Sequence, residues 1–170
     1  MILSKEKILE EIKNKKIVIT KTEIDDTTIK LHLGNEFRIF KEGIKQIVLT
    51  ENQDCKKFTK VVKKKEYLLQ PGEFILGVTK ETIKLPNNVA GLLTGRSRFA
   101  RLGLSVHSTS NYVHPGVNNK QVLEIKNNLN RPIVLKEGMG ICQLILFGVE
   151  GKAGYKGKFW RQSHVWFKYL

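Results

Sequence analysis

The segment Gly95-Arg96-Ser97-Arg98-Phe99-Ala100-Arg101-Leu102-Gly103-Leu104-Ser105-Val106-His107-Ser108-Thr109 carries more information than any other part of this 170-residue chain. A strand is expected just before it (Val89 to Thr94), and the segment itself predicts one helical turn (Ser97 to Leu102) and a second strand (Leu104 to Ser108). Arginines, a hydroxyl group and an imidazole are thus concentrated at a junction between strands. Further along, Val122-Leu123-Glu124-Ile125 places one carboxylate in an apolar strand. Cationic donors near an isolated acid suit proton transfer on an anionic substrate.

The rest of the chain consists largely of short segments rich in β-branched residues. The other expected strands are Ile17 to Ile19, Ile29 to Leu33, Glu36 to Phe40, Ile47 to Thr50, Phe58 to Val62, Tyr67 to Leu69, Phe74 to Lys80, Gln121 to Asn127, Ile133 to Leu135 and Ile141 to Phe147. Turn signals separate them: Leu33-Gly34-Asn35, Gln70-Pro71-Gly72, Leu85-Pro86-Asn87-Asn88, His114-Pro115-Gly116, Asn127-Asn128-Leu129-Asn130 and Glu137-Gly138. Many short strands with regular turns predict a mainly β sandwich or barrel of jelly-roll type.

One short helix is expected at the N-terminus. Ser4 is a suitable N-cap, Ile8, Leu9 and Ile12 are expected on one helix face, and Asn14 is a suitable end. The length fits a single domain covering residues 1–170. Residues 151–170 differ from the strands in being glycine-rich, basic and aromatic. This composition predicts a C-terminal arm that closes over a phosphate-bearing ligand or packs on a neighbouring subunit.

The composition excludes several classes of protein. No apolar run approaches the ~20 residues that span a membrane, and the first residues lack the pattern of a secretory signal, so a cytoplasmic protein is expected. Cys55 and Cys142 are isolated, and the histidines show no metal-ligand spacing, so neither a disulfide framework nor a zinc site is expected. The net charge of +14 favours anionic partners. Much of it comes from scattered lysines, so binding of nucleic acid is possible but not predicted.

The residue chemistry leaves two interpretations open. Arg96 and Ser97 can bind phosphate oxygens, and Arg101 shares a face with Ser97 if the turn is helical, but surface arginines flanking a turn would look the same. Strand alternation points Glu124 away from Leu123 and Ile125. If these two face the core, Glu124 faces water or a subunit interface.

A series of short motifs along the chain removes part of this ambiguity. They are Leu76 to Thr79, Ile83-Lys84-Leu85-Pro86, Gly95-Arg96-Ser97, Ala100-Arg101-Leu102-Gly103-Leu104, Val106-His107, Pro115-Gly116, Val122-Leu123-Glu124, Asn127 and Leu135-Lys136-Glu137-Gly138-Met139. Their order resembles the dCTP deaminase and dUTPase superfamily over nearly the whole chain. The motifs around Glu124 look most like dCTP deaminases, whereas the length and the tail look like compact archaeal dUTPases.

The resemblance implies a distorted β-barrel or jelly roll of the dUTPase-like type, assembled as a homotrimer with active sites at subunit interfaces. The implied ligand is a pyrimidine deoxynucleoside triphosphate that carries Mg²⁺, with no zinc. Glu124 would take a proton from the attacking water and return protons to the ring nitrogen and to ammonia, while Ser97 and Arg101 would position that water. The implied catalytic residues are Glu124, Ser97 and Arg101. The implied substrate-binding residues are Arg96, Ser97, Arg98, His107, Ser108, Thr109, Ser110, His114, Lys158 and Gln162.

Three departures from the family pattern bear on the reaction. His114 stands where an aspartate usually precedes Pro-Gly, Lys30 replaces an acid, and Arg98 replaces a serine. The first weakens the dUTPase interpretation more than the deaminase interpretation, which depends on Glu124. We therefore expect a hydrolase that deaminates dCTP to dUTP and ammonia. The alternatives are a dUTP diphosphatase, alone or bifunctional, and a catalytically weak nucleotide-binding relative.

Overall fold

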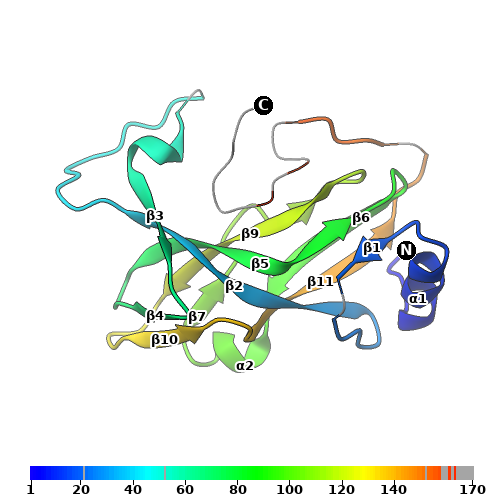
Figure 1. Ribbon diagram of the computed structural model, residues 1–170, viewed down its shortest axis with the longest axis horizontal. Coiled ribbons are helices and arrows are strands. Elements are labelled where there is room, and N and C mark those ends of the chain that lie inside the picture. The colour runs from blue at the N-terminus through cyan, green and yellow to red at the C-terminus, as the bar shows by residue number, and fades with distance from the viewer. Residues whose placement is uncertain (21, 52, 152, 158–160, 162, 164–170) are drawn as a thin grey trace.

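The computed structural model describes residues 1–170 except 21, 52, 152, 158–160, 162 and 164–170. Its nine-stranded sheet has the path β7-β9-β5-β2-β11-β6-β8, with β1 beside β5 and β3 beside β2, and β4 and β10 form a separate pair. The strands are β1 (Val18–Ile19), β2 (Thr28–Phe40), β3 (Thr59–Lys63), β4 (Glu66–Leu69), β5 (Phe74–Lys84), β6 (Val89–Gly95), β7 (Leu104–Val106), β8 (Tyr112–Val113), β9 (Asn118–Asn127), β10 (Ile133–Lys136) and β11 (Gly140–Gly148). The helical segments are α1 (Lys5–Lys13), the 3-10 turn η1 (Cys55–Lys57) and α2 (Ser97–Ala100). The prediction of a mainly β, barrel-like fold with a short N-terminal helix is confirmed (Figure 1).

The long strand β2 belongs to both halves of this sheet. Its first half pairs with β11 and its second half with β3, and β5 pairs beside it with a register shift between Leu33 and Phe37. The predicted turn at Leu33-Gly34-Asn35 is therefore wrong, because the chain continues through an irregularity in the strand. A Cβ atom at Gly34 would lie 2.9 Å from the carbonyl oxygen of Val78, so glycine permits the close approach of β2 to β5.

The N-terminal helix begins and ends where the sequence predicts. The Ser4 hydroxyl accepts a hydrogen bond from the Lys7 amide at 3.3 Å, and Asn14 is the C-cap. The left-handed residue is Lys15, however, and not Asn14. Ile8 is buried, but Leu9 is 47% exposed, because successive helical residues are about 100° apart and only one of this pair faces the sheet.

The predicted strand Ile47 to Thr50 is wrong. These residues are exposed and form no strand, and Leu49 is 86% exposed. A run of β-branched residues becomes a strand only when a neighbour pairs with it, and the described residues offer this run none. The sequence did not predict two short elements, β8 and η1. Both are too short for a periodic pattern.

Alternation on β9 separates the core from the candidate site. Leu123 and Ile125 are buried in the hydrophobic cluster, where each side chain contributes about 1.5–3 kcal/mol to folding. Glu124 between them is half-buried on the opposite face. The expected orientation of Glu124, away from the core, is thus confirmed, and the carboxylate is carried by one of the best-packed strands.

Candidate functional site

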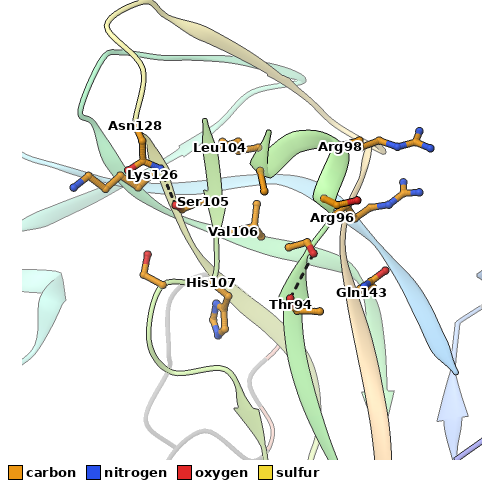
Figure 2. Close-up of a pocket in the computed structure, with 14 residues that line it drawn as sticks. Thr94, Arg96, Arg98, Leu104, Ser105, Val106, His107, Lys126, Asn128 and Gln143 are labelled. Carbon is orange, nitrogen blue, oxygen red and sulfur yellow. Dashed lines mark hydrogen bonds between the residues drawn. The ribbon is translucent and has the colours of Figure 1, made fainter. Parts of the chain in front are cut away.

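A polar pocket of about 760 Å³ lies among β6, α2, β7 and the end of β9 (Figure 2). Its volume is in the range of small-molecule sites. The residues that line it are Thr94, Gly95, Arg96, Ser97, Arg98, Ala100, Leu104, Ser105, Val106, His107, Ser108, Lys126, Asn128 and Gln143. The segment that the sequence singled out therefore provides most of one pocket.

Two arginines extend to the same side of this pocket from the start of α2 (Figure 2). β6 ends at Gly95 and α2 begins at Ser97, so Arg96 lies at the junction. Its Nη1 donates to the carbonyl oxygen of Gly140 at 3.1 Å, which anchors the guanidinium group on β11. Arg98 is exposed. Two guanidinium groups on one side of a cavity form a surface suited to phosphate oxygens.

The unusual residue Lys30 lies beside this arginine. Its ammonium group pairs with Glu23 and lowers the pKa of that carboxyl group. A Cβ atom at Gly140 would lie 2.8 Å from Cδ of Lys30 and 3.1 Å from Nη1 of Arg96. Glycine at this position lets the two cationic side chains pack against the same backbone. Glu23 then balances the charge that Lys30 introduces.

Ser97 and Arg101 stand at the two ends of the helical turn. The Arg101 amide donates to the Ser97 carbonyl oxygen at 3.0 Å, so the predicted helical turn is confirmed. Ser97 lines the pocket, whereas Arg101 is exposed and does not line it. The turn therefore directs one of the two candidate groups into the cavity and leaves the other available to solvent.

The carboxylate of Glu124 is held by one neighbouring residue. Oε2 accepts a hydrogen bond from the Thr109 amide at 2.7 Å and one from its hydroxyl at 3.2 Å. Oε1 has only a 3.4 Å contact with the same hydroxyl. Within the described chain, Oε2 is thus the orienting oxygen, and Oε1 is the oxygen that remains available to a ligand.

His107 begins the loop that contains Thr109 and holds it by hydrogen bonds. Its backbone φ is +70°, a left-handed conformation that ends β7 at Val106, earlier than the predicted Ser108. The Glu124 amide donates to Nδ1 of His107 at 3.2 Å, which leaves the proton on Nε2, and Nε2 lies 2.8 Å from the Ser110 carbonyl oxygen as its donor. The imidazole thereby links the 107–110 loop to β9 while lining the pocket.

Sequence reasoning missed Lys126, Ser105 and Asn128. All three line the pocket, and Nδ2 of Asn128 donates to Oγ of Ser105 at 2.7 Å and to the Gly103 carbonyl oxygen at 3.0 Å. Figure 2 shows Lys126 and Asn128 across the pocket from the two arginines. The period of two was a usable signal for Lys126, because it places Lys126 on the same strand face as Glu124.

The catalytic candidates lie toward opposite ends of β7. Arg101 precedes Gly103 at the start of this strand, and Glu124 bonds to His107 at its end. The four residue steps from Gly103 to His107 correspond to about 13 Å of extended chain. Among the residues with described coordinates, no hydrogen bond or ion pair joins Glu124 to Ser97 or Arg101, and Glu124 does not line the pocket.

The remaining candidates are distributed around this region. Ser108 lines the pocket, and Thr109 and Ser110 form the loop over Glu124. His114 lies outside the pocket and stacks on Tyr155. Lys158 and Gln162 lie outside the described residues.

Metal ligands are not gathered in the described part of the chain. No group of three or more histidine, cysteine or acidic side chains there has the arrangement of a metal site. Burial raises the pKa of the Cys142 thiol, which disfavours the thiolate that a metal would require.

Among the described residues, none of the helices has the length and apolarity of a transmembrane segment.

Comparison with a family model and with known proteins points to the same family in each case. Residues 2–149 match the family model described as dCTP deaminase-like. The dUMP-forming dCTP deaminase of Dictyoglomus turgidum is 37% identical over 161 residues, which cover 90% of this chain and 83% of that protein. The dCTP deaminase of Buchnera aphidicola is 43% identical over 145 residues, covering 77% of this chain and 75% of the relative.

Solved structures share the fold. The 2'-deoxycytidine 5'-triphosphate deaminase from Agrobacterium tumefaciens superposes with a TM-score of 0.64 at 19% identity, and the match covers 85% of this chain and 47% of that chain. The chain therefore spans about half the length of that structure. The EIAV dUTPase superposes with a TM-score of 0.54 at 15% identity over 83% of this chain and 95% of its own. The predicted dUTPase-like type of the β fold is confirmed.

Proposed function

The chain belongs to the dCTP deaminase-like family, and we propose that it is an enzyme that deaminates dCTP by hydrolysis. The observation that carries the proposal is the position of Glu124. Its carboxylate stands on the outer face of an apolar strand and is oriented by the Thr109 amide, in the same loop whose first residues, His107 and Ser108, line the pocket. Such an acid is well oriented for proton transfer and is attached to a rigid element.

The two oxygens of Glu124 have different roles in this proposal. Oε2 stays bonded to Thr109, which keeps the carboxylate in one orientation. Oε1 takes a proton from the water that attacks the ring carbon bearing the amino group. Glu124 passes this proton to the ring nitrogen, then takes the proton of the newly added hydroxyl group and passes it to the amino group. The bond from the ring carbon to the amino nitrogen breaks, ammonia leaves, and the hydroxyl oxygen becomes the carbonyl oxygen of uracil. Ser97 and Arg101 position the water and stabilise the charge that develops on the ring.

The triphosphate binds in the pocket, away from the water that Glu124 activates. Arg96, Arg98 and Lys126 give the pocket a positive lining, and the anchored guanidinium of Arg96 needs little reordering when a phosphate binds. The described residues hold no cluster of acidic side chains for a cation, so the phosphates of the nucleotide would carry the Mg²⁺. There it would neutralise part of the phosphate charge.

A second copy of the chain completes the site. Arg101 and Glu124 lie toward opposite ends of β7, and the strand between Gly103 and His107 spans about 13 Å. An assembly in which the α2 turn of one subunit faces Glu124 of the next would bring them together, as in a head-to-tail ring. We infer a homotrimer with sites between subunits, with residues 151–170 of the single domain serving as an arm.

The product of the reaction is the second part of the proposal. Deamination alone gives dUTP and ammonia. The name of the Dictyoglomus relative favours a coupled reaction, in which a second water attacks the α-phosphorus and pyrophosphate leaves, so that dUMP is the final product. The Buchnera relative bears the name dCTP deaminase alone. The shared first step rests on Glu124, so we place deamination first and regard coupled hydrolysis as the stronger of the alternatives.

One incubation separates these activities. The purified protein is given dCTP or dUTP with Mg²⁺, and nucleotides, ammonia and pyrophosphate are measured over time. Ammonia with dUTP indicates deamination alone, and ammonia with dUMP and pyrophosphate indicates the coupled reaction. Pyrophosphate from dUTP without any ammonia from dCTP would contradict the proposal. Binding of dCTP without turnover would favour the non-catalytic relative.

A further inference from the structure

A cluster of aromatic rings lies on the barrel outside the pocket. The rings of His114 and Tyr155 stack with centroids 4.5 Å apart and planes 12° apart. Tyr112 meets the same imidazole edge-on at 4.8 Å, and its own ring lies 6.3 Å from that of Phe147. His114 thus contacts one ring that is nearly parallel to it and one that is nearly perpendicular to it. Tyr155 is partly buried and packs against the hydrophobic core.

The backbone around Tyr155 is held from two sides. Its amide donates to the Pro115 carbonyl oxygen at 2.9 Å, and the Ala153 amide donates to the Asn87 carbonyl oxygen at 3.1 Å. A Cβ atom at Gly116, where φ is +81°, would lie 2.7 Å from Oδ1 of Asn87 and 3.5 Å from the Tyr155 amide nitrogen. Residues 153–155 are therefore hydrogen-bonded to the turns at Asn87 and Pro115, and the His114 ring stacks on Tyr155.

The surroundings of His114 indicate packing through the ring rather than acid–base work. Within the described chain, no hydrogen bond or ion pair engages its ring nitrogens. His114 does not line the pocket, and the 107–110 loop that holds Glu124 is built without it. The flat stack supplies dispersion and aromatic contact, for which a benzene ring would serve as well.

We propose that His114 is a positioning residue, which fixes the start of the C-terminal arm by stacking on Tyr155 and takes no part in proton transfer. The kinetic consequence rests on the proposed function, because Lys158 and Gln162 of the arm are among the residues that the family resemblance implies for substrate binding. The structural consequence does not depend on it. Lys156 follows Tyr155 directly and is exposed, so trypsin cleavage after Lys156 reports whether this segment has come loose.

The test compares His114→Phe with His114→Ala. The rate of trypsin cleavage after Lys156 should rise about 2- to 10-fold in the alanine variant, the range set by one aromatic pair, and should stay near the original rate in the phenylalanine variant. Leu68→Ala is the matched control, because Leu68 is 52% exposed on β4, which pairs with β10. Thermal unfolding of each variant verifies that the barrel is intact.

Turnover of dCTP provides the second readout. The alanine variant should show a raised KM with little change in kcat, and phenylalanine should restore the KM and keep the pH profile of the original protein. The inference is overturned if phenylalanine is cleaved as fast as alanine, or if alanine leaves the cleavage rate unchanged. It is equally overturned if phenylalanine protects Lys156 but abolishes or reshapes the pH dependence of kcat. A protein that turns over no dCTP would still give the cleavage result, which separates this inference from the proposed function.

Discussion

The two ends of β7 differ in how their side chains are held. At its start, the α2 turn presents Ser97 and the arginines, and Arg98 and Arg101 are exposed. At its end, Glu124 is oriented by Thr109, and His107 links the loop to β9 on both sides of the imidazole. The Glu124 end is therefore preorganised, whereas the α2 end is a half-site that a ligand or a second chain would complete. This difference shows that candidate catalytic residues close in sequence need not form one catalytic centre within one chain.

The largest effect is expected at the prepared end. Glu124→Gln keeps the shape and the strand but removes the base, so we expect kcat for dCTP to fall about 10³-fold. Stopped-time assays of ammonia release provide the measurement. Glu66→Gln is the matched control, because Glu66 pairs with Lys136 on the surface, and this variant should retain full activity. A Glu124→Gln protein that deaminates normally would remove Glu124 from the mechanism.

Arg101→Ala tests the exposed end. The loss of a preorganised donor should lower kcat about 10²-fold. The thermal stability of the isolated chain should change little, because Arg101 is exposed. Kinetics and thermal unfolding are measured on the same preparation. If activity is kept, the α2 turn contributes only to binding, and the comparison between the two ends would need a different partner for Glu124.

Arg96→Ala should act chiefly on binding. A charge-assisted hydrogen bond contributes about 1.5–3 kcal/mol, so we expect KM for dCTP to rise about 10- to 100-fold. Arg96→Lys should recover only part of this, because lysine lacks the guanidinium fork. Nucleotide binding measured calorimetrically on the Glu124→Gln protein separates affinity from turnover. An equal loss for dCTP and deoxycytidine would contradict a role at the phosphates.

The smallest effect is expected at Lys126. Its exposed side chain lines the pocket, so Lys126→Met should raise KM only a few-fold, in line with about 1 kcal/mol for a screened charge. The difference should shrink when salt is added, since screening weakens the remaining attraction. Lys84→Met on the exposed end of β5 is the control. An effect that is independent of salt would indicate packing instead of charge.

Much of the strand pattern could be predicted from alternation and turn residues, because β9 and β11 each bury one face. Ile47 to Thr50 could not, since pairing depends on a partner distant in sequence. The same holds for the site. Arg96, Ser97 and Glu124 stand out by their chemistry. The hydrogen bonds through which His107 links its loop to β9 depend on a left-handed backbone at His107, which no sequence signal predicts. The contact between His114 and Tyr155 joins positions far apart along the chain, so no local pattern could reveal it.

Complementation between two inactive proteins tests the central claim most directly, namely that each site combines Glu124 of one subunit with the α2 turn of another. Glu124→Gln and Arg101→Ala proteins are unfolded together in equal amounts, refolded as a mixture, and assayed for ammonia release from dCTP. In a head-to-tail trimer with random mixing, about one quarter of the sites receive both intact residues, so the mixture should recover about one quarter of the original activity. Separate refolding of each protein is the control. A mixture as inactive as its two components, with mixed trimers demonstrated by mass spectrometry, would contradict a shared site.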